Sequence, residues 1–161
     1  MDILSELSIR LYEPPLSALR DNGGIADLSN PLSVVMLLID FETEVSMNGI
    51  ADFIGNSTGL YANETVVALE LIGCKTAAVT LKTILQVASA AGMTHEAIQA
   101  DRAGLEPYTL TSFSELHGRK WESALSKINQ LCNRIDFEHM LRAAEAFIAK
   151  HRSTFEKALG V

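Results

Sequence analysis

The sequence holds 161 residues, of which 48% are hydrophobic and 20% are charged, and its formal net charge is −7 at pH 7. This length suits one domain with a full hydrophobic core, and the composition excludes disorder of the whole chain. Twenty acidic residues stand against thirteen basic ones, which argues against direct binding to nucleic acid or to an anionic membrane surface. We therefore expect residues 1–161 to form a single domain.

The cysteines and the N-terminal residues indicate the cellular compartment in which the protein is expected. Cys74 and Cys132 are too few and too far apart for a disulfide framework, so we expect two buried thiols, with a single disulfide as the alternative. The first residues lack the features of a secretory signal, and the longest apolar run is much shorter than the ~20 residues of a membrane span. We expect a cytoplasmic protein without membrane contact.

The first elements are separated by strong turn signals. Apolar residues at helical spacing predict a helix over residues 3–12, which two prolines end. Turn residues follow until Asn30, which has the character of a helix N-cap with proline next in the chain. The helix predicted over residues 31–47 is apolar almost all round, which is typical of a core helix, and Gly49 ends it. A buried strand is the alternative for its most apolar part.

Five further segments show helical patterns, over residues 64–72, 75–91, 94–103, 112–132 and from Asp136 onward. Ser112 and Glu115 have the spacing of a capping box. We expect Val67 and Leu71 on the apolar side of the helix over 64–72. Tyr108, Phe113 and Trp121 are expected as core anchors. No stretch alternates polar and apolar residues for long, so the sequence predicts an all-α, single compact multi-helix domain of about seven helices.

Charge is distributed unevenly along the chain. Residues 1–70 contain eleven acids and two bases, Arg10 and Arg20, for a net charge of −9, whereas residues 71–161 have a net charge of +2. An N-terminal half with this negative charge can dock on a basic surface of a partner protein. The alternative is a solvated face that keeps the protein soluble.

Three acids, Asp40, Glu42 and Glu44, fall near the C-terminal end of the predicted core helix. The helix dipole disfavours carboxylates there by about 0.3–1 kcal/mol each. We therefore expect a compensating group, which can be a neighbouring helix N-terminus, a base such as Arg10 or Arg20, or a partner protein.

Motifs for catalysis are scarce. The sequence has no P-loop, Rossmann fingerprint or GxSxG, and its four histidines lack metal-ligand spacing. We expect no cofactor, no metal and no enzymatic activity. The alternative is a small-ligand or catalytic pocket around Glu44, Asp40 and His139.

The segment from Glu44 to Gly59 reads EVSMNGIADFIGNSTG. It resembles the signature of a bacterial all-helical family that includes an acidic, dimeric DNA mimic, and the similarity extends over residues 34–90. The residues that match the signature are Glu44, Val45, Gly49, Phe53, Asn56, Ser57 and Gly59. The sequence departs from the signature at Met47, Asn48, Ile50 and Asp52.

The matching residues also have a structural interpretation. Gly49 and Gly59 allow backbone conformations that other residues resist. Asn56 and Ser57 can bond backbone groups of a turn, and Phe53 is apolar. We expect Glu44 to accept hydrogen bonds from the N–H groups that open the short segment after Gly49.

The leading hypothesis is a non-enzymatic binding protein whose acidic half docks on a basic protein surface. The resemblance implies that this surface belongs to a DNA-binding regulator, such as a transcription regulator, and that the protein is a homodimer. The acids expected to contact the partner are Asp21, Asp27, Asp40, Glu42 and Asp52. An immunity-type protein that neutralises its target is a further alternative.

Overall fold

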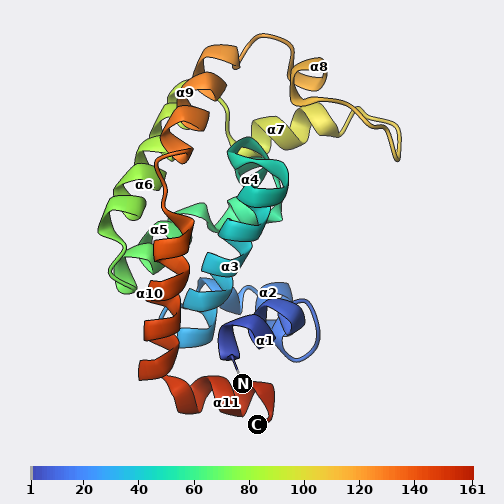
Figure 1. Ribbon diagram of the computed structural model, residues 1–161. Coiled ribbons are helices and arrows are strands. Elements are labelled where there is room, and N and C mark those ends of the chain that lie inside the picture. Colours follow the sequence, from blue (N-terminus) through green and yellow to red (C-terminus); the bar gives the residue numbers. More distant parts are fainter. Residues whose placement is uncertain (1) are drawn as a thin grey trace.

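The computed structural model describes residues 2–161 and consists of helices joined by short loops (Figure 1). Within this range there are eleven α-helices and two short 3₁₀ helices, and no strand is formed. The prediction of an all-α, single compact domain is confirmed. The predicted number of about seven helices is wrong, because two predicted helices are each divided in two and because short helices form over residues 16–21 and 50–55, where the sequence pattern predicts none.

The helices have the following bounds: α1 Ile3–Arg10, α2 Leu16–Asp21, η1 Gly24–Ala26, α3 Pro31–Asn48, α4 Ile50–Gly55, η2 Ser57–Tyr61, α5 Ala62–Leu71, α6 Lys75–Ala90, α7 His95–Arg102, α8 Phe113–His117, α9 Glu122–Cys132, α10 Phe137–Lys150 and α11 Arg152–Leu159. Among these described helices, none has both the length and the apolar character needed to cross a membrane.

Two predicted helices are each divided in two. The segment predicted over 112–132 begins with the expected capping box of Ser112 and Glu115, but Gly118 at φ 63° ends α8 after one turn. The last predicted helix bends at His151, which separates α10 from α11. Apolar spacing is similar on both sides of each break, so periodicity alone does not reveal it.

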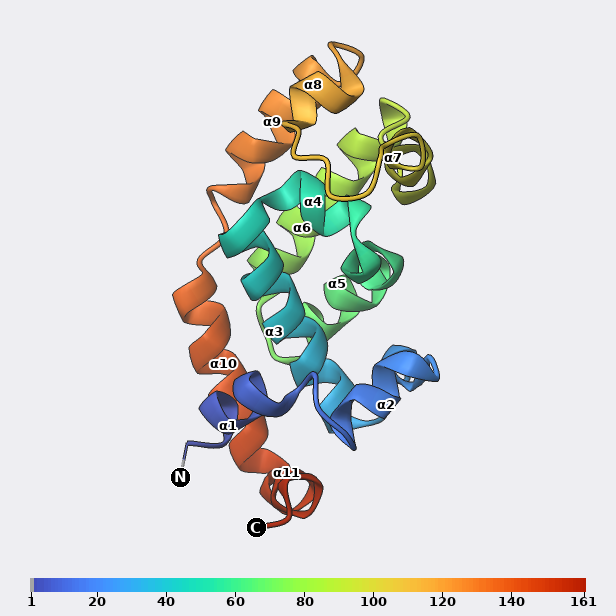
Figure 2. The ribbon, with the colours of Figure 1, turned by 90° about the vertical axis from the view of Figure 1, so that its right-hand side faces the viewer.

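Helix α3 lies at the centre of the molecule (Figures 1 and 2). Its N-terminus is capped as predicted, because the side chain of Asn30 accepts a hydrogen bond from Leu32 N at 3.1 Å. Residues 33–41 are all buried, which confirms the predicted core helix. Gly49 ends α3 at φ 91°, a conformation that favours glycine.

The other helices surround α3 on several sides. Helix α5 packs on α3 and α6, and α6 packs on α9, whereas α10 runs beside α3. Helices α1 and α11 close one end of the molecule, where both chain termini lie in both views (Figures 1 and 2). A hydrogen bond of 2.9 Å from Arg10 Nη1 to the carbonyl oxygen of Leu159 joins α1 to the end of α11.

The predicted aromatic anchors do not all lie in the core. Trp121 is buried, and the half-buried ring of Phe113 lies 6.2 Å from it between centroids. Tyr108 is fully exposed on the loop between α7 and α8, so its prediction as a core anchor is wrong (Figure 1). This loop contains turn and polar residues on both sides of Tyr108 and buries little apolar surface.

Candidate functional site

Asp40 lies on α3 with only 4% of its surface exposed, and Arg20 of α2 binds it. Nη2 of Arg20 is 2.8 and 2.6 Å from the two carboxylate oxygens, and the Tyr12 hydroxyl donates to the same carboxylate at 3.2 Å. Arg20 Nη1 also donates to the carbonyl oxygen of Leu11 at 3.1 Å. The prediction that Asp40 contacts a partner is therefore corrected, because its own chain encloses the carboxylate.

Burial raises the pKa of Asp40, although the hydrogen bonds and charge of Arg20 act in the opposite direction. Of the compensating groups expected for the acids of α3, Arg20 is the one found at Asp40. A small cavity of about 150 Å³ adjoins this pair and is lined by Arg20, Asp40, Ser57, Thr58, Leu60 and Tyr61.

Glu44 is held by side-chain amides. Its Oε1 accepts hydrogen bonds from Asn48 Nδ2 at 2.8 Å and from Asn56 Nδ2 at 2.5 Å. The expected donors, the backbone N–H groups that open α4, are not among its partners, so that prediction is wrong. Two neutral amide donors still stabilise the carboxylate at the end of α3, where the helix dipole opposes it.

Arg102 of α7 extends this network to Asp52 of α4. Its Nη1 donates to Asn56 Oδ1 at 2.6 Å, and its Nη2 lies 2.5 Å from Asp52 Oδ1. The side chain of Asp52 is 32% exposed, and its charge is compensated within the chain. Asp52 is thus a weaker candidate for partner contact than the sequence suggests.

Sequence reasoning misses Arg102, because some fifty positions separate it from Asp52 and no local pattern joins them. Two other α7 side chains also bind the C-terminal end of α4. His95 Nδ1 is 3.1 Å from the carbonyl oxygen of Ile54, and Gln99 Nε2 donates to that of Gly55. Helix α7 therefore satisfies backbone acceptors that would otherwise be left open at a helix end.

The rest of the predicted motif shapes the backbone and the core. A Cβ atom at Gly59 would lie 1.9 Å from the carbonyl oxygen of Ile54, so only glycine fits there. The Phe53 ring packs against Phe41 with centroids 4.8 Å apart. Ser57 is exposed at the start of η2. The segment from Glu44 to Gly59 is thus mainly a structural element.

Three of the five predicted contact acids remain available on the surface. Asp21 and Asp27 are exposed and Glu42 is half-buried, and none of them forms an ion pair with any residue of the described range. The hydroxyl and N–H of Ser29 bond Asp27 Oδ1 at 2.6 and 3.0 Å and hold the pKa of Asp27 below its ordinary value.

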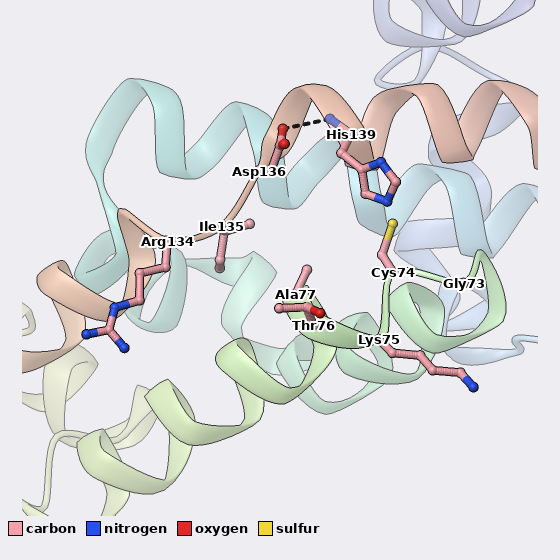
Figure 3. Close-up of a pocket in the computed structure, with 9 residues that line it drawn as sticks. All are labelled: Gly73, Cys74, Lys75, Thr76, Ala77, Arg134, Ile135, Asp136 and His139. Atoms are coloured by element: carbon pink, nitrogen blue, oxygen red, sulfur yellow. Dashed lines mark hydrogen bonds between the residues drawn. The ribbon is translucent and has the colours of Figure 1, made fainter.

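A separate cavity of about 180 Å³ lies between the start of α6 and the start of α10 (Figure 3). The sulfur of Cys74 and the imidazole of His139 face each other there. Burial, with a contribution from the charge of Asp136, raises the pKa of Cys74, whereas a nucleophilic cysteine needs a lowered pKa. Asp136 Oδ1 accepts from His139 N at 2.8 Å as the cap of α10.

The pocket predicted around Glu44, Asp40 and His139 does not form as one site. Asp40 lines the cavity beside Arg20, and His139 lines the cavity beside Cys74. Both cysteines are buried and free, as expected from the sequence.

Fold and site together define an all-helical domain with an acidic N-terminal half and a tightly hydrogen-bonded α3–α4 junction. The chain matches the family model of DMP19-like protein over residues 26–151, most of its length, and it belongs to that family. The match includes the whole Glu44–Gly59 segment and extends well beyond residues 34–90. No curated protein and no solved structure matches the chain.

Replacement of Arg20 leaves the Asp40 carboxylate buried without its partner. We expect Arg20→Met to lower the free energy of unfolding by about 3 kcal/mol at neutral pH. The lone carboxyl binds a proton more tightly in the folded than in the unfolded chain, so stability falls as pH rises through its folded pKa and is partly regained toward about pH 5. Urea unfolding at neutral pH and at about pH 5 measures the free energy of unfolding of the variant and of the unaltered protein.

The matched control is Arg142→Met, which removes an exposed pair with Glu138 and changes stability by less than about 1 kcal/mol at either pH. An Arg20→Met loss of the same size at both pH values would contradict the structure.

The two amides that bind Glu44 differ in their importance. Asn56→Ala leaves both Glu44 and Arg102 short of a partner, and we expect a loss of about 2 kcal/mol in unfolding free energy. Asn48 is exposed, so Asn48→Ala costs about 0.5 kcal/mol or less, since water replaces its amide. Thermal and urea unfolding compare the two variants. Equal losses would show that the Asn56 connection to α7 does not hold the junction.

Proposed function

We propose that this protein is a non-enzymatic protein-binding domain whose acidic N-terminal half docks on a basic protein surface that ordinarily holds DNA. The observation that carries the proposal is the charge left after internal pairing. Arg20 is bound by Asp40, and Arg10 by the Leu159 carbonyl oxygen and by Glu6 at 3.7 Å. Both bases of this half are therefore engaged, while Asp21 and Asp27 stay exposed.

The physical basis is electrostatic complementarity. Duplex DNA carries about one charge per 1.7 Å of axis, and a protein that binds DNA presents bases to match it. Exposed carboxylates such as Asp21 and Asp27 attract the same bases, and a homodimer of this chain would double their number. Attraction of this kind raises association rates and weakens with salt.

Membership of the DMP19-like family supports the proposal, since the resemblance in the Glu44–Gly59 segment implies an acidic DNA mimic among the relatives. The departures from the signature leave the fold of the segment intact. Met47 is exposed, and Asp52 is bound by Arg102. Gly49 still makes the turn between α3 and α4.

The alternative of a small-ligand or catalytic pocket has less support. The Asp40 cavity is small, and its carboxylate is already bound by Arg20 and Tyr12. An immunity-type partner would use the same acidic surface, and the identity of genes beside this one separates it from a DNA mimic.

The test is capture of basic DNA-binding proteins from lysate of the source cell at low and high salt, with mass spectrometry and with duplex DNA as competitor. We expect a partner that is released by DNA and by salt. The double variant Asp21→Lys with Asp27→Lys should reduce capture at least about tenfold, since two attractions become repulsions. The control reverses exposed acids of the other half, Glu96→Lys with Glu145→Lys, and keeps capture.

A basic partner that binds both double variants equally, or that DNA does not displace, would contradict DNA mimicry.

A further inference from the structure

Helix α5 is apolar on two opposite sides. Its inner side, with Val66, Ala68 and Leu69, is buried where α5 packs on α3 and α6. On its outer side Val67 and Leu71 are 41% and 50% exposed. The sequence pattern places both outer residues with the buried ones, so the prediction that they belong to the apolar side facing the core is corrected.

An apolar helix of this kind normally lies in a core with neighbours all round. Residues 33–41 of α3 have that environment, but α5 is covered on its inner side only. Leu60, at the end of η2, is 58% exposed and precedes Val67 and Leu71 at spacings of seven and eleven residues. Leu60, just before α5, and Val67 and Leu71 on α5 form an exposed apolar stripe, called the α5 stripe below.

Carboxylates lie on both sides of the α5 stripe. Successive residues of an α-helix are about 100° apart, which places Glu64 on one edge of the stripe, one turn from Leu60 and from Val67, and Glu70 on the other edge, beyond Val67. Neither glutamate forms an ion pair within residues 2–161. The surface is thus an apolar line with uncompensated negative charge along its two edges.

We infer that the α5 stripe binds a basic amphipathic helix of a partner protein, a helix with apolar residues at i, i+4, i+7 and i+11 and lysine or arginine on either side. Anchors at i, i+7 and i+11 of such a helix have the same spacing as Leu60, Val67 and Leu71, and Glu64 and Glu70 match its charges. The inference rests on the proposed function in taking the partner to be a basic protein, and it specifies which element of that partner binds here.

A second copy of the chain fits the α5 stripe less well. Two α5 helices packed face to face would bring Glu64 and Glu70 of one copy toward the same carboxylates of the other. Like charges at close range cost free energy, whereas a lysine-flanked helix gains it. The stripe also begins beside Asp40, because Leu60 lines the cavity that adjoins the Arg20–Asp40 pair, which leaves a recess for an anchoring side chain.

The test uses a synthetic helical peptide with leucines at the stated spacing and lysines along both edges. Titration into ¹⁵N-labelled full-length protein, followed by amide chemical shifts, locates the binding site and gives Kd. We expect shifts centred on η2 and α5. Val67→Ser with Leu71→Ser should weaken binding at least about tenfold, and Glu64→Gln with Glu70→Gln should weaken it and reduce its salt dependence.

The matched control is Val79→Ser on α6, a valine that is 65% exposed outside the α5 stripe, and it should bind the peptide as the unaltered protein does. Shifts centred elsewhere, unchanged affinity of the stripe variants, or equal binding of a peptide with glutamates in place of lysines would each overturn the inference. Sedimentation that shows a dimer dissociated by Val67→Ser with Leu71→Ser would overturn it too, because a second copy would then occupy the stripe.

Failure of this inference and failure of the proposed function give different results. A captured protein that DNA displaces can depend on Asp21 and Asp27 but not on Val67 and Leu71. That result supports the proposed function and contradicts the helix-binding site on α5. If the peptide binds at α5 but DNA displaces no captured protein, the result supports the helix-binding site and contradicts DNA mimicry.

Discussion

The burial of residues 33–41 of α3 on all sides is the constraint on which the rest of the structure depends. A helix with apolar residues all round needs cover from every direction, and helices from both ends of the chain supply it. One acid, Asp40, falls within this buried stretch, so Arg20 must reach it from α2. That requirement uses one of the two bases in the N-terminal half and makes its exposed surface more uniformly acidic.

The junction between α3 and α4 shows acids used to hold a fold rather than to bind a partner. Glu44 and Asp52 both belong to one network, in which Asn56 and Arg102 connect α3, α4 and α7. Neighbouring acids such as Glu42 remain outside it. Net charge alone therefore overstates the negative surface that a partner meets, and the hydrogen-bond partners of each carboxylate decide which acids count.

The sequence predicts the helical class, the core helix and several caps, because Asn30, Ser112 and Asp136 act locally on the next residues of the chain. It does not predict the Arg102 ion pair, which joins residues brought together only by tertiary packing. Nor does it distinguish the covered from the open side of α5, since Val66 and Val67 have the same side chain and differ only in what lies opposite them.

The use of the Glu44–Gly59 segment in internal contacts has a consequence for how this family can diverge. Close backbone approach at Gly59 and hydrogen bonding at Glu44 and Asn56 restrict substitution within the segment, whereas Asp21, Asp27 and the exposed side of α5 bear no such restriction. Relatives can therefore share the segment and carry different outer surfaces. Substitutions on the outer surface can therefore change which partner such a protein binds while its core stays the same.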